Sequence, residues 1–181
     1  MRKLFLFLGL GVLFVFPTFA SAQNNVTIAN MTVQLWPEYD QPSMLVIADF
    51  QVAADSSFPV DLTIRIPQEA NLIAVASLAS DGTFLNALFD GPKAAAEWQV
   101  FTLTISENTV YRFEYYQPLS FNGNQRIFSY LWDGSYAVDQ FHVLVLEPRY
   151  VTAISMSPAY ESISHENGRN YYDSVFVILA K

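Results

Sequence analysis

Strict alternation of apolar and polar residues constrains the fold of this sequence more than any other feature, because a period of two belongs to a β-strand with one buried face. The pattern runs through residues 60–66 and 101–106, and it recurs more briefly at 31–35 and 111–115. After residue 22, no long stretch keeps the spacing of a helix. The sequence therefore predicts an all-β chain.

Three other runs are apolar at every position, which is typical of strands that are covered on both faces. They occupy residues 44–48, 143–146 and 175–179. We expect these strands to lie centrally in their sheets. The one place where a helical turn is expected is 93–97, which contains three consecutive alanines.

Turn signals separate the runs at regular intervals, with glycine or asparagine suited to a positive φ or proline to a fixed φ. They are Pro37 and Pro42, 55–57, 81–82, 90–92, 122–124, 133–134 and 167–168. About ten strands at a spacing of about 8–12 residues predict a two-sheet antiparallel β-sandwich with Ig-like or jelly-roll connectivity. The length of the chain predicts one domain, over residues 23–181.

The N-terminal 22 residues have the three parts of a secretory signal peptide. Arg2 and Lys3 supply the positive charge, residues 4–16 are almost wholly apolar, and 20–22 form an Ala-Ser-Ala cleavage site. The apolar core is shorter than the roughly 20 residues of a spanning helix. We therefore expect cleavage before Gln23, with a mature protein that is secreted or held in the periplasm or cell envelope and is not inserted in the membrane.

Composition narrows the class of partner. Because Arg2 and Lys3 fall in the signal, residues 23–181 carry a net charge of −10, compared with −8 for the whole chain. This charge repels phosphate backbones and anionic lipid surfaces, so nucleic acid is not expected as a partner. The chain contains no cysteine, and an exported domain of this size without disulfides favours a bacterial origin.

Catalytic residue types occur together only once, where Ser135, Asp139 and His142 fall within eight residues. No Gly-x-Ser-x-Gly elbow surrounds Ser135, and residues 133–136 have the pattern of a turn that leads into a strand. A histidine within a strand is more often a packing residue than a general base. No catalytic residue is therefore predicted, although carboxylates dispersed along the chain leave a hydrolase as an alternative.

Metal-binding patterns are also missing from the sequence. The two histidines, His142 and His165, are not spaced as zinc ligands, and no cofactor motif occurs. Loop oxygens near Asp81, Asp90 or Asp133 leave a structural calcium ion as an alternative. The sequence predicts neither a metal nor a cofactor.

Aromatic residues make up 15% of the chain and are the one class in excess. Phe128, Tyr130 and Trp132 are spaced by two, so in a strand they line one face. Aromatic rings are favoured in sandwich cores, so we expect this face to belong to the core; the alternative is a solvent-exposed face that stacks on sugar rings or contacts a protein. Among the aromatic rings, Trp132, Tyr136 and Trp36 are those that we most expect to be exposed, because each stands at a predicted strand end. These three are the candidate ligand-binding residues.

Several segments together resemble a group of uncharacterised bacterial exported β-sandwich domains. The resemblance rests on the Trp-Pro-Glu-Tyr-Asp segment at 36–40, on 113–116, on the Phe-x-Tyr-x-Trp segment at 128–132 and on Tyr-Ala-Val-Asp-Gln at 136–140. It covers most of the mature chain and implies an exported β-sandwich. It implies no activity, cofactor or catalytic residue. Relatives in that group often carry a C-terminal membrane segment, whereas here a strand-like run ends at Lys181.

Taken together, these features predict an exported, non-enzymatic β-sandwich module that binds a protein or a polysaccharide at the cell envelope or outside the cell. The first alternative is a glycan-active or other hydrolytic enzyme with dispersed catalytic residues. The second is an envelope structural or assembly subunit, which would pair through an exposed strand edge.

Overall fold

The computed structural model describes residues 26–179, and this part of the chain is built from strands, turns and loops without a helix. The predicted all-β class is confirmed. The predicted signal peptide, residues 1–22, and the expected new N-terminus at Gln23 lie outside the described residues. Within the described range there is accordingly no helix of the length and hydropathy needed to cross a bilayer.

The larger of the sheets has eight strands. Their order is β12 (Ser162–Glu166), β13 (Arg169–Ile178), β11 (Ala137–Leu146), β1 (Thr27–Pro37), β2 (Ser43–Val52), β8 (Tyr111–Pro118), β4 (Asn71–Leu78) and β5 (Phe84–Asn86). All neighbours are antiparallel except β1 and β11, which run parallel with Thr27 opposite Ala137 and Leu35 opposite Val145. The prediction of antiparallel pairing throughout is wrong at this pair, because residue alternation defines a strand but not the direction of its partner.

The smaller sheets come from the middle of the chain. One has three strands in the order β3 (Val60–Pro67), β7 (Trp98–Ile105) and β6 (Phe89–Ala95), and the other is the hairpin of β9 (Ser120–Asn122) and β10 (Gln125–Ile127). The helical turn expected at 93–97 is wrong. Lys93 and Ala95 belong to β6 and pair with Val100 and Trp98 of β7, so pairing in the sheet outweighs the helix propensity of alanine.

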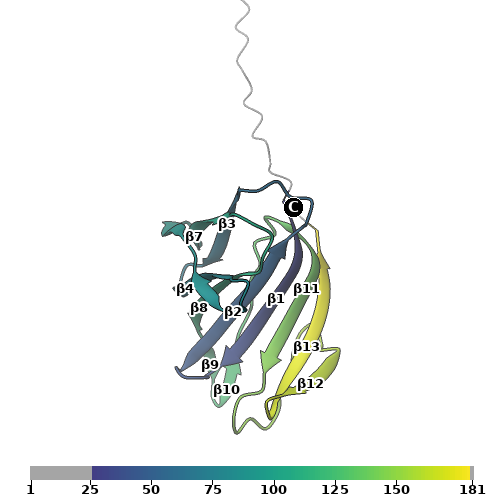
Figure 1. Cartoon of the computed structure of the whole chain (residues 1–181). Coiled ribbons are helices and arrows are strands. Elements are labelled where there is room, and N and C mark those ends of the chain that lie inside the picture. Colours follow the sequence, from purple (N-terminus) through teal and green to yellow (C-terminus); the bar gives the residue numbers. More distant parts are fainter. Residues whose placement is uncertain (1–25, 180–181) are drawn as a thin grey trace, which may run out of the picture.

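The main core lies between the three-stranded sheet and one face of the eight-stranded sheet. Phe101 of β7 meets Phe113 of β8 edge to face, with 5.7 Å between ring centroids. Leu62 and Ile64 of β3 belong to the same buried cluster as Val46 of β2. Figure 1 shows β3 and β7 on the side of the large sheet where β2, β4 and β8 lie, away from β12 and β13.

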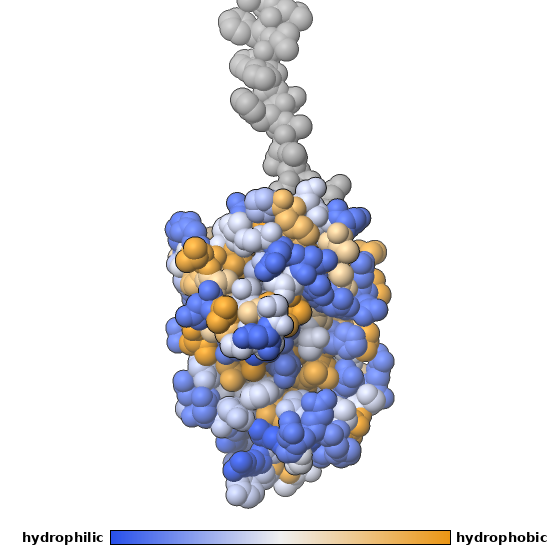
Figure 2. Space-filling view, in the orientation of Figure 1, coloured by the Kyte–Doolittle hydropathy of each residue, from blue (hydrophilic) through white to orange (hydrophobic). Residues whose placement is uncertain are grey.

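The apolar runs differ in burial although their sequences look alike. Residues 44–48 of β2 are buried at every position, which confirms the expected coverage on both faces. In β13, Val177 is 71% exposed, so the same expectation is wrong there. The cause is strand length: β12 pairs with β13 only as far as Asp173, and among the described strands the rest of β13 has a neighbour on one side only. Figure 2 shows hydrophobic residues on one face of the molecule as separate patches among hydrophilic ones.

Candidate functional site

The structure brings two of the three candidate ligand-binding residues together. Trp132 and Tyr136 both lie in residues 128–136, the connection between β10 and β11. The strand expected at 128–132 is absent, since these residues pair with no other strand in the described part of the chain. Alternate side chains nevertheless turn inward, and Phe128, Tyr130 and Trp132 pack against the core. We call residues 128–136 the covering loop.

Tyr136 closes the open side of β3. This strand is at the edge of the three-stranded sheet, and the backbone N–H of Thr63 donates to the Tyr136 hydroxyl at 2.8 Å. Burial raises the pKa of Tyr136, and the hydrogen bond from Thr63 acts in the opposite direction. The expected exposure of this ring is wrong: Tyr136 is half-buried and satisfies a strand edge that would otherwise be open.

An ion pair fastens the covering loop to the same strand. Arg65 Nη1 of β3 lies 2.8 Å from Asp133 Oδ2 and 2.6 Å from Ser135 Oγ. The Ser135 hydroxyl donates to Asp133, so it is committed to this cluster. His142 lies in β11 opposite Thr32 and Val175, and no hydrogen bond joins it to Ser135 among the described residues. The three catalytic residue types therefore do not assemble into a triad here.

An open pocket of about 510 Å³ lies beside this ion pair. It is lined by Arg65, Trp98, Leu131, Trp132, Asp133 and Ser135. Its two tryptophans are held differently. The centroids of the Trp132 and Phe141 rings are 6.2 Å apart, and Trp132 packs on the core. Trp98, at the start of β7, is half-buried and is not among the side chains packed on the core. Leu131 is exposed at the rim. The expected exposure of Trp132 is therefore wrong as well, because the ring is half-buried.

Trp36 lies at the other end of the large sheet. Thr27, at the start of β1, is opposite Ala137, and Trp36 lies nine positions further along the extended strand, or about 30 Å away. The half-buried Trp36 ring packs on Tyr39 with 4.7 Å between centroids. Its exposure is again less than expected. Trp36 therefore belongs to a different surface from Trp132 and Tyr136.

The aspartates of the calcium alternative each have a local partner. Asp81 accepts the backbone N–H of Thr83 at 2.9 Å, which lowers its pKa, and Asp90 pairs with Lys93. Asp133 pairs with Arg65. Over residues 26–179, no group of three or more His, Cys, Asp or Glu side chains is arranged to hold a metal ion.

The sequence analysis missed Arg65, Trp98 and Leu131 as pocket residues. Arg65 and Trp98 come from β3 and β7, far along the chain from the covering loop, and only the packing of the two sheets brings them beside it. Leu131 directly precedes Trp132 and faces the opposite way. The sequence analysis selected Trp132, whose ring faces inward, and missed Leu131, which faces outward. The one available signal was that Trp98 stands just before an alternating strand, at a strand end like the three candidates.

Comparison with known proteins identifies the fold but no family. No protein-family model and no curated protein matches the sequence. Among solved structures, the chain is similar to native yeast LTA4 hydrolase, with a TM-score of 0.53, 10% identity, and coverage of 85% of this chain and 27% of that chain. Yeast LTA4 hydrolase in complex with Bestatin gives a TM-score of 0.55, 10% identity, and coverage of 88% and 28%. The chain thus spans little more than a quarter of those chains, and the likeness shows the fold alone.

Proposed function

We propose that this chain is an exported, non-enzymatic β-sandwich module that binds a polysaccharide at the cell envelope or outside the cell. The eight-stranded and three-stranded sheets would be the two layers of the sandwich. The signal-peptide pattern of residues 1–22 supports export. The observation that carries the proposal is the pocket of Trp98, in which a flat ring that is free of the core lies beside fixed polar groups.

Sugar rings need the combination that this pocket offers. One face of a pyranose is apolar and stacks on a flat aromatic ring, while its hydroxyls need hydrogen-bonding partners with fixed positions. Trp98 and Leu131 supply the apolar surface. Asp133 and Ser135 hold Arg65 Nη1, so the guanidinium is oriented before a ligand arrives and its other N–H groups point away from those two bonds.

The experiment that tests this proposal measures binding of the purified protein to a panel of soluble and immobilised polysaccharides. We expect saturable binding to at least one neutral glycan, and a loss of about ten-fold or more in affinity for Trp98→Ala. Trp98→Phe, which keeps a flat ring, should recover part of the affinity.

Two results would contradict the proposal. If no glycan of the panel binds saturably, or if Trp98→Ala binds like the unchanged protein, the pocket is not a sugar site. Shortening of the polymer during incubation would instead favour the hydrolytic alternative.

A second candidate function, assembly in the envelope, is favoured by one observation. Beyond Asp173, β13 pairs with no strand on its β12 side within residues 26–179, and this stretch presents the exposed side chains of Val175 and Val177. The Val175 N–H donates to Glu161 Oε1 at 3.4 Å. An open apolar strand edge is a template for pairing with another chain. Light scattering that shows a dimer or larger assembly, disrupted by Val177→Lys, would support this function over the binding module.

A further inference from the structure

A second pocket, of about 540 Å³, opens at the end of the large sheet, away from the Trp98 pocket. It lies between the residues that follow β11 and the tight turn that joins β12 to β13. Glu147, Arg149, Tyr150, Asn167, Arg169 and Asn170 are among the residues that line it. This volume is in the usual range for a ligand site, roughly 300–1,000 Å³.

Two arginines of this pocket, Arg149 and Arg169, have no carboxylate partner among the described residues. Within residues 26–179, the other four Lys and Arg side chains each form an ion pair, namely Arg65 with Asp133, Lys93 with Asp90, Arg112 with Asp49 and Arg126 with Glu38. Arg149 and Arg169 have no carboxylate oxygen within 4.0 Å in the same part of the chain. The whole chain has a net charge of −8, so two unpaired cations in one pocket form a local exception.

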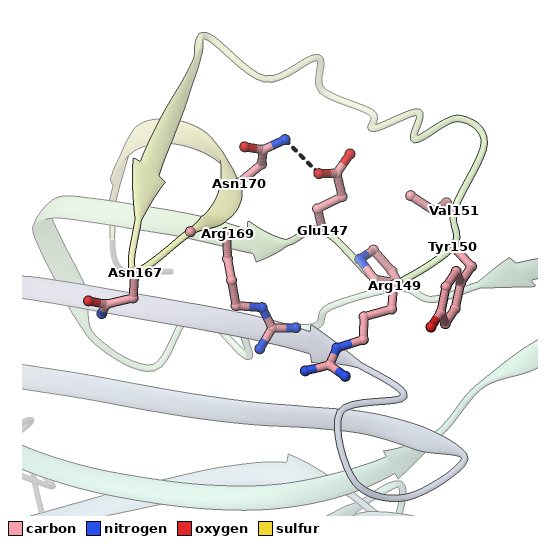
Figure 3. Close-up of a pocket in the computed structure, with 9 residues that line it drawn as sticks. Glu147, Arg149, Tyr150, Val151, Asn167, Arg169 and Asn170 are labelled. Atoms are coloured by element: carbon pink, nitrogen blue, oxygen red, sulfur yellow. Dashed lines mark hydrogen bonds between the residues drawn. The ribbon is translucent and has the colours of Figure 1, made fainter.

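Neighbouring carboxylates do not neutralise this pair. Glu147 accepts hydrogen bonds from Asn170 Nδ2 at 2.6 Å and from the Tyr172 hydroxyl at 3.2 Å. Figure 3 shows Glu147 turned toward Asn170 on one side of the pocket, while the guanidinium groups of Arg149 and Arg169 both extend to the other side. Glu166 is opposite Arg169 in the β12–β13 hairpin, yet no ion pair joins them. Exposed Arg149 and half-buried Arg169 thus line one pocket with no carboxylate of the described residues between them.

Aromatic rings adjoin the arginines. The Arg169 guanidinium lies over the Tyr39 ring at 5.3 Å from its centroid, and the Tyr39 ring also packs on Trp36. Tyr150 is 99% exposed and has a φ of 64°, in the left-handed region that is unfavourable for a bulky side chain. The pocket therefore combines two unpaired guanidinium groups with rings that reach solvent.

We propose that this pocket binds the carboxylate groups of an acidic polysaccharide, a polymer that contains uronic acid units. A guanidinium group matches a carboxylate with two parallel hydrogen bonds, and two such groups in a pocket repel each other until an anion lies between them. Tyr150 offers a face on which a sugar ring stacks, and the amides of Asn167 and Asn170 suit its hydroxyls. This second site is separate from the Trp98 pocket and does not depend on it.

Titration calorimetry of the purified full chain with an oligogalacturonate is the test. We expect saturable binding that weakens as salt is added, and a loss of affinity of about ten-fold to a hundred-fold for Arg149→Gln and for Arg169→Gln. Lys93→Gln is the matched control, because it makes the same change in net charge at an exposed ion pair outside the pocket. It should bind like the unchanged protein, as should Trp98→Ala, which affects only the other pocket.

Three results would overturn the proposal. Absence of saturable oligogalacturonate binding would remove the site, and an equal loss in Lys93→Gln would show general attraction to a polyanion. Inorganic phosphate or an acidic peptide that binds through Arg149 and Arg169 as tightly as the oligogalacturonate would show that the site does not select a sugar. Because Trp98→Ala is predicted to have no effect here, failure of this site and failure of the neutral-glycan site are seen separately.

Discussion

Two strands with similar apolar sequences, β2 and β13, differ in how far their apolar side chains are buried. Each carries an apolar run, 44–48 within β2 and 175–178 at the end of β13. In β2 all five are buried, while in β13 Val177 is 71% exposed. The outward-facing Leu45 of β2 lies between two aromatic neighbours, Trp36 of β1 and Tyr116 of β8. In the part of the chain that the structure describes, Val177 pairs with no residue on the β12 side. An apolar run therefore indicates a strand, but its place in the sheet order decides whether the run belongs to the core.

Phe113 offers the largest test of this contrast. It is buried, and its ring lies near those of Phe101 at 5.7 Å and Phe50 at 6.2 Å. Phe113→Ala leaves a cavity between the two sheets, so we expect a loss of about 3–5 kcal/mol in the free energy of unfolding, measured in urea. Phe121→Ala, at an exposed ring of β9, is the control and should cost less than about 1 kcal/mol.

A milder substitution at Phe113 can be measured even if the alanine variant does not fold. Phe113→Leu keeps most of the volume and should cost about 1–2 kcal/mol. A Phe113→Leu variant as stable as the unchanged protein would contradict the placement of this ring in the core between the sheets.

A matched pair of valines tests the comparison of β2 with β13 directly. Val46→Ala and Val177→Ala remove the same two methyl groups, one from a fully buried site and one from an exposed site. We expect the first to lower the free energy of unfolding by about 2 kcal/mol or more and the second to change it by less than about 0.5 kcal/mol. Equal losses would mean that the end of β13 is covered in solution, which the assembly alternative requires.

The smallest expected effect concerns Tyr136, which covers the edge of β3. Tyr136→Phe leaves the Thr63 N–H without its acceptor and should cost about 1 kcal/mol at neutral pH. Tyr116→Phe, which loses an exposed hydroxyl contact with Asp40, should cost less.

The alkaline side of the stability profile gives a second measurement of Tyr136. Burial raises its folded-state pKa above the ordinary 10.0, so the stabilising contribution is complete below that value and is lost as pH rises through the folded pKa. The free energy of unfolding should therefore fall between about pH 9 and about pH 12, and less steeply in Tyr136→Phe. An identical profile for both proteins would show that Tyr136 is not buried.

Local sequence predicted the strands well because alternation reflects burial on one face. It predicted neither the parallel pair of β1 and β11 nor the pairing of β6 with β7, since both depend on which distant strand lies alongside. In the covering loop, residues 128–132 keep the alternation of a strand without pairing as one. There the alternation reflects only the packing of every second ring on the core.

The residues of the candidate sites were likewise only partly predictable from the local sequence. The sequence analysis named Trp132 and Tyr136, which lie in the same loop, but predicted exposed rings where the structure has half-buried ones. Trp98, the ring left free of the core, comes from a strand about 30 residues earlier. The sequence analysis did not select Arg149 or Arg169, because only the folded structure shows which arginines have a carboxylate partner.

The central claim is that the two tryptophans of one pocket have separate roles, Trp132 in holding the fold and Trp98 in binding. Measuring the free energy of unfolding and the glycan affinity of Trp132→Ala and Trp98→Ala side by side tests this most directly. We predict that Trp132→Ala loses roughly 2–3 kcal/mol of stability, and that Trp98→Ala loses less than about 1 kcal/mol of stability but about ten-fold or more in affinity. A Trp98→Ala variant that is strongly destabilised, or a Trp132→Ala variant that is fully stable, would contradict the account.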